Sequence, residues 1–318
     1  MAFRAALGSL VLAALLACAT AAQAQSYPNK PVQVFIHFNP GAVVDILGRV
    51  FADEMGTLLG QQFVVVNREG ASGIIANQAV AQARPDGYTL AWTPQGSIVV
   101  QPQIKKDLGY TFDSFQPICQ MFENQFVMLV SPDSPYRNLK DIVDYASANP
   151  GKMSFGVFGI ASVPHLQMHS FLFAAKLNMT QVPYKSIATM AADTASRQID
   201  IGITAFGSFN PQQVRVAAVL ASRRNPLAPD IATTAEAGYP VSDPAFGGLI
   251  APKGTPPEVL KTLETACEKV HQGAKYQEIL KRTGTPGPYL GSADYLKRMR
   301  EDIKSKGELV RALNIKDE

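Results

Sequence analysis

Short β-branched runs that alternate with amphipathic helical segments constrain the fold of this chain more than any other feature. The elements expected first are strands at 32–36, 63–66 and 88–92 and helices at 43–59 and 74–83. Such alternation implies right-handed crossovers between parallel strands, with helices covering the sheet. We therefore predict an α/β fold.

The alternation restarts after an apolar run at 126–130, which predicts a second α/β unit. Its expected elements are helices at 138–148, 164–176 and 187–198 and strands at 153–157, 180–183, 199–204 and 214–221. A further apolar run at 246–251 precedes two charged helices expected at 257–282 and 292–313. Because 318 residues exceed what one hydrophobic core usually organises, we expect two lobes.

We place the boundaries of the lobes where the chain enters and leaves the second unit. Lobe 1 is expected to comprise residues 25–126 and 247–318, and lobe 2 residues 127–246, each a sheet flanked by helices. Two chain crossings between the lobes make a hinge and leave a cleft between them.

The charge pattern excludes nucleic acid as a partner. Net charge is only +3, and in the C-terminal stretch the two signs alternate at helical spacing, as between Lys297 and Lys304. That alternation is typical of a solvated helix face rather than of a polyanion-binding stripe.

The N-terminus has the pattern of an export signal. Arg4 precedes the mostly apolar run 5–17, which is too short to span a bilayer, and the small residues at 22–24 suit a signal peptidase. We interpret residues 1–24 as a cleaved signal peptide. The alternative is a lipobox in which Cys18 is acylated and anchors the protein.

Cys119 and Cys267 remain after cleavage of the signal. Export permits a disulfide, but nothing in the sequence places the two residues within bonding distance. We therefore favour two buried free thiols over a disulfide.

The chain lacks the usual signatures of catalysis. It contains no GxSxG, P-loop or GxGxxG motif, so we expect no catalytic residues and no cofactor. His165 and His169 lie four apart on an expected helix, but residue 166 is Leu and no third ligand follows, so we expect no metal site. The alternative in this class is a secreted α/β hydrolytic enzyme that uses His165 with Asp or Ser residues.

The loop after the first strand is the most informative candidate site. It contains Phe38, Asn39, Gly41 and Ala42 and opens the helix at Val43. We expect the backbone N–H groups of residues 42–44 to have no intrahelical acceptor, so that they and the helix dipole can bind an anion. Asp45, in the first turn, is expected to cap its own helix instead of contacting ligand.

Similar loops follow other strands in both lobes. In a doubly wound sheet, loops at the carboxyl ends of the strands surround the ligand crevice, so loops of the two lobes are expected to face one another. These loops contribute Ser97, Phe158, Ala161, Ser162, Tyr184, Lys185, Ser186 and Ile187 as candidate ligand-binding residues. A small carboxylate with two acidic ends would fit between two opposed helix N-termini.

The chain also resembles the substrate-binding receptors of tripartite tricarboxylate transporters, the Bug family. The matching motifs, in order, are Tyr27–Pro31 at the mature N-terminus, Pro40–Asp45 with PGGxxD, Asn67–Gly73 with NRPGAGG, Pro85–Thr89 with PDGYT, Val182–Lys185 with VPYKGG, Thr234–Gly238 with TxAEAG and Ala251–Pro256 with APxGTP. The likeness covers nearly all of residues 27–315.

This resemblance implies a periplasmic binding protein with the type II fold that closes on a small organic acid. It implies delivery of the acid to inner-membrane permease subunits, with delivery to a sensor kinase as an alternative, and we expect a monomer. In the family two loops hold a carboxylate like pincers, partly through ordered water. Those positions correspond to 38–43 and 184–188 here.

The sequence departs from the family at the site itself. The second glycine of PGG is Ala42, and the glycines after Lys185 are Ser186 and Ile187. Ala205 stands where an acidic residue often ends a strand, which disfavours a ligand ammonium group. We therefore expect a carboxylate without an amine, with an apolar body that contacts Phe38, Phe158 and Phe206.

Overall fold

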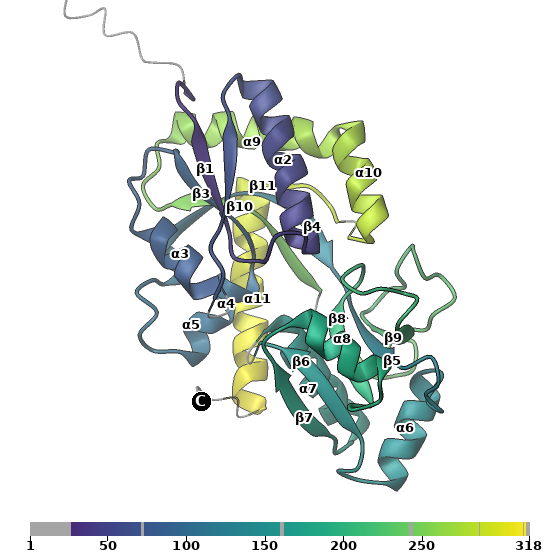
Figure 1. Cartoon of the computed structure of the whole chain (residues 1–318). Helices are drawn as coiled ribbons and strands as arrows, with labels where there is room; N and C mark the ends of the chain where they lie inside the picture. The colour runs from purple at the N-terminus through teal and green to yellow at the C-terminus, as the bar shows by residue number, and fades with distance from the viewer. Residues whose placement is uncertain are drawn as a thin grey trace, which may run out of the picture.

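The computed structural model describes residues 27–70, 73–159, 162–241, 244–285, 287–313 and 315. The expected signal peptide, Cys18 and Ala161 lie outside the described residues. Two sheets flanked by helices form two lobes, one above the other in Figure 1. Within the described residues, none of the helices is both long and apolar enough to cross a membrane.

Lobe 1 is built on a six-stranded sheet with the order β11-β4-β10-β3-β1-β2. Its strands are β1 (Val32–Ile36), β2 (Phe63–Asn67), β3 (Thr89–Pro94), β4 (Phe115–Asn124), β10 (Ala245–Pro252) and β11 (Leu290–Gly291). Its helices are α2 (Val43–Leu59), α3 (Ile74–Ala81), α4 (Gly96–Val99), α5 (Gln101–Ile104), the short 3₁₀ helix η2 (Phe112–Ser114), α9 (Pro257–Gln272), α10 (Ala274–Thr283) and α11 (Ser292–Ala312).

Lobe 2 is built on a five-stranded sheet with the order β7-β6-β8-β5-β9. Its strands are β5 (Phe126–Val130), β6 (Ser154–Phe158), β7 (Thr180–Tyr184), β8 (Ile201–Ala205) and β9 (Arg215–Leu220). Its helices are α6 (Leu139–Ala148), α7 (Val163–Ala175) and α8 (Ile187–Ala195). The two-lobed α/β fold expected from the sequence is confirmed.

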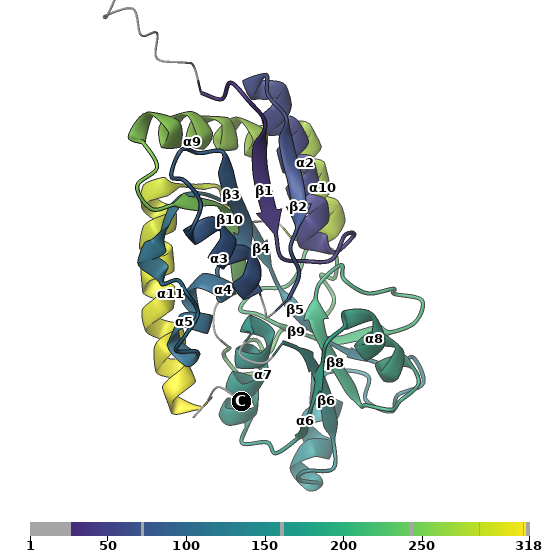
Figure 2. The same cartoon turned by 60° about the vertical axis from the view of Figure 1, so that its left-hand side comes forward.

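The chain passes from one sheet to the other twice, between β4 and β5 and again between β9 and β10. Near the first crossing, Glu123 accepts hydrogen bonds from Arg223, which follows β9, and from Arg298 on α11, each at 2.6 Å. Helix α11 runs along lobe 1 and reaches lobe 2, where it contacts α7 (Figures 1 and 2). Both crossings and α11 therefore join the lobes.

The structure corrects three expectations about the elements. The sheets are mixed rather than parallel, because β10 runs antiparallel to β3 and β4, and β5 antiparallel to β8 and β9. The helix expected at 257–282 is two helices, since Gly273 is extended at φ −70° and ψ 140°. Strand β4 was not expected, because its run contains Pro117 and polar residues despite its burial.

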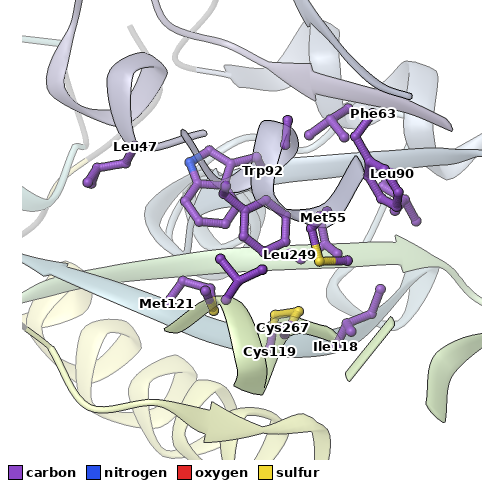
Figure 3. Packing of buried hydrophobic residues seen from close by; sticks show 14 of the residues in the cluster. Leu47, Met55, Phe63, Leu90, Trp92, Ile118, Cys119, Met121, Leu249 and Cys267 are labelled. Carbon is purple, nitrogen blue, oxygen red and sulfur yellow. A yellow bond between two sulfur atoms is a disulfide. The ribbon is translucent and has the colours of Figure 1, made fainter. Parts of the chain in front are cut away.

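The core of lobe 1 is organised around Trp92 (Figure 3). Its ring stacks on Phe51 at 4.6 Å between ring centroids and also contacts Phe122. The indole nitrogen donates to the carbonyl of Val44 at 3.1 Å. A Cβ at Gly48 would lie 2.4 Å from Ile36 Cδ1, so only glycine lets α2 approach β1 this closely. The core thereby fixes where α2 begins.

Cys119 and Cys267 form a disulfide that joins β4 to α9, which corrects the expectation of two free thiols. The two residues are 148 positions apart in the sequence, and both are fully buried in the core shown in Figure 3. Only the packing of α9 on β4 brings them together, which local sequence patterns do not encode. The chain segment that the disulfide closes, residues 119–267, includes all of lobe 2.

We predict that replacing both cysteines with alanine lowers the free energy of unfolding by about 2–5 kcal/mol, because closing a long loop restricts the unfolded chain. Chemical denaturation of both proteins measures the difference. Alkylation of the denatured wild-type protein without reductant supplies the control and is expected to label neither residue. Labelling of both would contradict the disulfide.

Candidate functional site

The carboxyl ends of the parallel strands in each sheet point toward the other lobe. Strand β1 pairs in parallel with β2 and β3, and β6 pairs in parallel with β7 and β8. The arrowheads of β1 and β8 point toward each other across the molecule (Figure 2). The loops after these strands, which the sequence singled out, therefore lie on facing sides of the two lobes.

The start of α2 is held by Asp45, which caps its own helix as expected. Asp45 is 1% exposed and accepts hydrogen bonds from the Gly41 amide at 2.9 Å, from Arg49 at 2.9 Å and from Asn67 at 2.7 Å. Burial would raise the pKa of this carboxyl, but the hydrogen bonds from Arg49, Asn67 and Gly41 outweigh it and lower the pKa. Asp45 thus shapes the loop and stays ionised.

This arrangement uses one of the three amides, those of residues 42–44, that the sequence predicted to be free. The Ala42 amide donates to the carbonyl of Asn39 at 3.1 Å, and the Gly41 amide is taken by Asp45. Within the described residues the amides of Val43 and Val44 have no acceptor. These two amides are therefore available to a ligand.

The other residues of the first loop are tied to neighbouring strands. The Phe38 ring is partly exposed and lies 4.3 Å from the His37 ring, and its carbonyl accepts from Asn67 at 2.8 Å. Asn39 donates its side-chain amide to Glu69, which follows β2, at 2.7 Å. The start of the loop is thus held by Asn67, which ends β2, and by Glu69, which follows it.

Ser97 is buried, 5% exposed, and its hydroxyl is used inside the protein. It lies 2.9 Å from the hydroxyl of Thr93 and donates to the carbonyl of Pro94 at 3.2 Å. At the neighbouring Gly96 a Cβ would be 3.1 Å from Val163, the first residue of α7. The two lobes therefore touch beside this loop, and Ser97 supports the site from behind.

In lobe 2 the loop before α7 is closed by its own hydrogen bonds. The Ser162 hydroxyl donates at 3.0 Å to the carbonyl of Phe158, a partly exposed residue that ends β6. His165 and His169, on α7, both direct Nε2 at the side-chain carbonyl of Gln181, at 3.0 and 2.7 Å. The two rings thus share Gln181 as a hydrogen-bond partner.

The loop between β7 and α8 combines one structural tyrosine with exposed polar groups. Tyr184 donates to Asp193 at 2.7 Å, and desolvation together with that carboxylate raises the pKa of its hydroxyl to about 12. Ser186 caps α8 by accepting from the Thr189 amide at 3.4 Å, while Lys185 is exposed and Ile187 is partly exposed. The amides of Ile187 and Ala188 have no acceptor among the described residues.

Two candidates at the end of β8 differ in their surroundings. Ala205 is partly exposed and pairs with Phe126. Phe206 is 8% exposed and packs with Val127, Leu129 and Phe209 in a hydrophobic cluster. We therefore leave Phe206 out of the site, because its ring serves the core.

His37 is the functional candidate that the sequence reasoning missed. It directly follows β1 and contacts Phe38 and Thr93, whose hydroxyl is 3.4 Å from Nδ1. Its partner Thr93 is 56 positions away, so no local sequence pattern links the two residues. Its place immediately before the Phe38 loop is the one signal that could have revealed it.

We predict that Asp45→Ala lowers the free energy of unfolding by about 2–4 kcal/mol and weakens ligand binding, because it removes charged hydrogen bonds from a buried carboxylate. Asp53→Ala is the matched control on the same helix, since Asp53 is exposed and pairs only with Lys275 at the surface. Its effect is expected to stay below about 1 kcal/mol. Chemical denaturation and calorimetry measure both, and equal effects would contradict the assigned role of Asp45.

Comparison with known proteins adds independent findings. The family model described as "Tripartite tricarboxylate transporter family receptor" matches residues 47–315. A UPF0065 protein of Bordetella pertussis is 31% identical over 307 residues, covering 95% of each chain.

Two solved structures share the fold over almost their whole length. R. palustris Rpa4515 with adipate has a TM-score of 0.85 and 26% identity, covering 91% of this chain and 99% of that one. MatC (Rpa3494) from Rhodopseudomonas palustris with bound malate has a TM-score of 0.79 and 25% identity, covering 89% and 100%.

Proposed function

Because the chain belongs to the tripartite tricarboxylate transporter receptor family, and is therefore a periplasmic solute-binding protein and not an enzyme, we propose that it captures a small organic carboxylate between its lobes and delivers it to inner-membrane permease subunits. The structures of Rpa4515 with adipate and MatC with malate contain ligands of this class. Export by the signal peptide at residues 1–24 and action as a monomer belong to the same proposal.

The main support for this proposal is a pair of helix N-termini, those of α2 and α8. Each follows a strand whose carboxyl end faces the other lobe. The amides of Val43 and Val44 open α2, those of Ile187 and Ala188 open α8, and within the described residues none of the four has an acceptor. Free amides and the positive end of a helix dipole favour a carboxylate.

The free energy of binding requires more than the two helix dipoles supply. Micromolar affinity needs about 8 kcal/mol, whereas one helix end supplies about 0.3–2 kcal/mol. Hydrogen bonds to charged oxygens, at about 1.5–3 kcal/mol each, and apolar burial supply the remainder. Closure of residues 127–246 onto residues 25–126 and 247–318 would provide that burial.

The ligand is a carboxylate without an amine in this proposal. Ala205 ends β8 without a charge that could neutralise an ammonium group, while the partly exposed rings of Phe38 and Phe158 suit an apolar body. Lys185 is exposed on the loop before α8 and adds positive charge.

A thermal-shift and calorimetry panel tests the proposal. Adipate, malate and succinate are compared with aspartate and glutamate at equal concentration. A ligand at 100 times its Kd adds about 2.7 kcal/mol to stability and raises Tm. We expect stabilisation by the non-amino acids; tightest binding of aspartate or glutamate, or binding of no carboxylate, would contradict the proposal.

The role of the α8 amides is tested by Ile187→Pro. Proline is tolerated at the first helical position and Ser186 before it is extended, so α8 is preserved while one donor is removed. We expect carboxylate affinity to fall about 10- to 100-fold by calorimetry. Ile187→Ala keeps the amide and is the control; equal losses in the two variants would assign the effect to the side chain.

A further inference from the structure

His37 occupies the middle of the lobe 1 half of the proposed site. It follows β1, which lies between β2 and β3 in the sheet. A Cβ at Gly73, where α3 begins, would lie 2.9 Å from Cγ and Nδ1 of the imidazole, and the Phe38 ring lies 4.3 Å away. Gly73 thus covers the Cγ end of the ring, because the same Cβ would also lie 3.0 Å from Cδ2, and the Thr93 hydroxyl faces Nδ1.

The opposite nitrogen, Nε2, has no partner among the described residues, and the side chain is partly exposed. Since the residue follows β1 at the carboxyl edge of the sheet, Nε2 is the polar atom of the ring that remains available to a ligand bound there. Desolvation lowers the pKa of His37 to about 4, so the ring is neutral at pH 7 and one nitrogen keeps a lone pair.

The hydrogen bonds behind the ring indicate which nitrogen carries the proton. The Thr93 and Ser97 hydroxyls make four contacts behind the ring: His37 Nδ1 to the Thr93 hydroxyl at 3.4 Å, the two hydroxyls to each other at 2.9 Å, and each hydroxyl to the Pro94 carbonyl at 3.2 Å. With a proton on Nδ1, three protons serve three of these four contacts. Without it, the two hydroxyl protons serve only two of them.

We infer that His37 is a specificity-determining residue that presents the lone pair of Nε2 to the ligand, so that the receptor prefers a carboxylate bearing a hydroxyl group over the same acid without one. This inference rests on the proposed function. A bare carboxylate oxygen opposite a lone pair is repelled, whereas a hydroxyl group donates to it. Thr93 and Ser97 are positioning residues that fix the tautomer.

Calorimetry with matched acids tests the inference on the mature protein at pH 7.5. The pairs are malate with succinate, 3-hydroxyadipate with adipate, and lactate with propionate. We expect about tenfold tighter binding of the hydroxylated member, equivalent to about 1.4 kcal/mol. His37→Gln is expected to reduce that preference to about one, and Thr93→Val to reduce it while leaving the imidazole in place.

His271→Gln is the matched control, because His271 belongs to α9, the helix at the end of lobe 1 remote from lobe 2 (Figure 1), and bonds the Gly287 carbonyl at 3.2 Å. It is expected to keep the wild-type preference. Nitrogen-15 NMR of the wild-type imidazole, assigned with His37→Gln, reports the tautomer directly and is expected to show Nδ1 protonated and Nε2 bare.

The outcomes separate the two proposals. Binding of plain acids as tightly as hydroxylated ones, a preference that survives His37→Gln or Thr93→Val, or a proton on Nε2 would each overturn the role of His37 while leaving carboxylate capture intact. Binding of none of the acids would instead overturn the proposed function.

Discussion

A buried carboxylate, that of Glu123, is the interaction on which the arrangement of the two lobes depends. Its side chain is 6% exposed and is bound by Arg223 from the chain after β9 and by Arg298 from α11. Arg298 also lies 4.1 Å from the Phe246 ring at the start of β10. Removing one partner of a buried ion pair leaves an uncompensated charge, so Glu123 ties both crossings to α11.

That junction decides which surfaces of the lobes face one another, and local interactions then decide what those surfaces offer. In lobe 1 the Trp92 indole holds the first turn of α2 from the core, and Asp45 holds the preceding loop. In lobe 2 the Ser186 hydroxyl caps α8. These hydrogen bonds use some polar groups at each helix start and leave other backbone N–H groups free. Packing therefore decides which donors remain as much as helix geometry does.

The proposed site combines backbone amides, which bind carboxylates in general, with side chains that select among them. Free amides at helix starts recognise a carboxylate by charge alone and accept many acids. Side chains around them would discriminate among those acids, and the proposed candidates are His37 and Asn39, which contact Thr93 on β3 and Glu69 after β2. A receptor family can therefore keep the same backbone arrangement and bind different ligands by changing a few side chains of this kind.

Local sequence determined much of this molecule. A β-branched run and a period of 3.6 residues located β1 and α2 with the limits that the structure has, and the position of Asp45 in the first turn predicted its cap, because each depends on residues a few positions apart. The tertiary structure alone decided the Cys119–Cys267 disulfide, the burial of Ser97 and Phe206, and the contact of His37 with Thr93. These join residues brought together by the folding of whole sheets, and no local period records which distant side chains will meet.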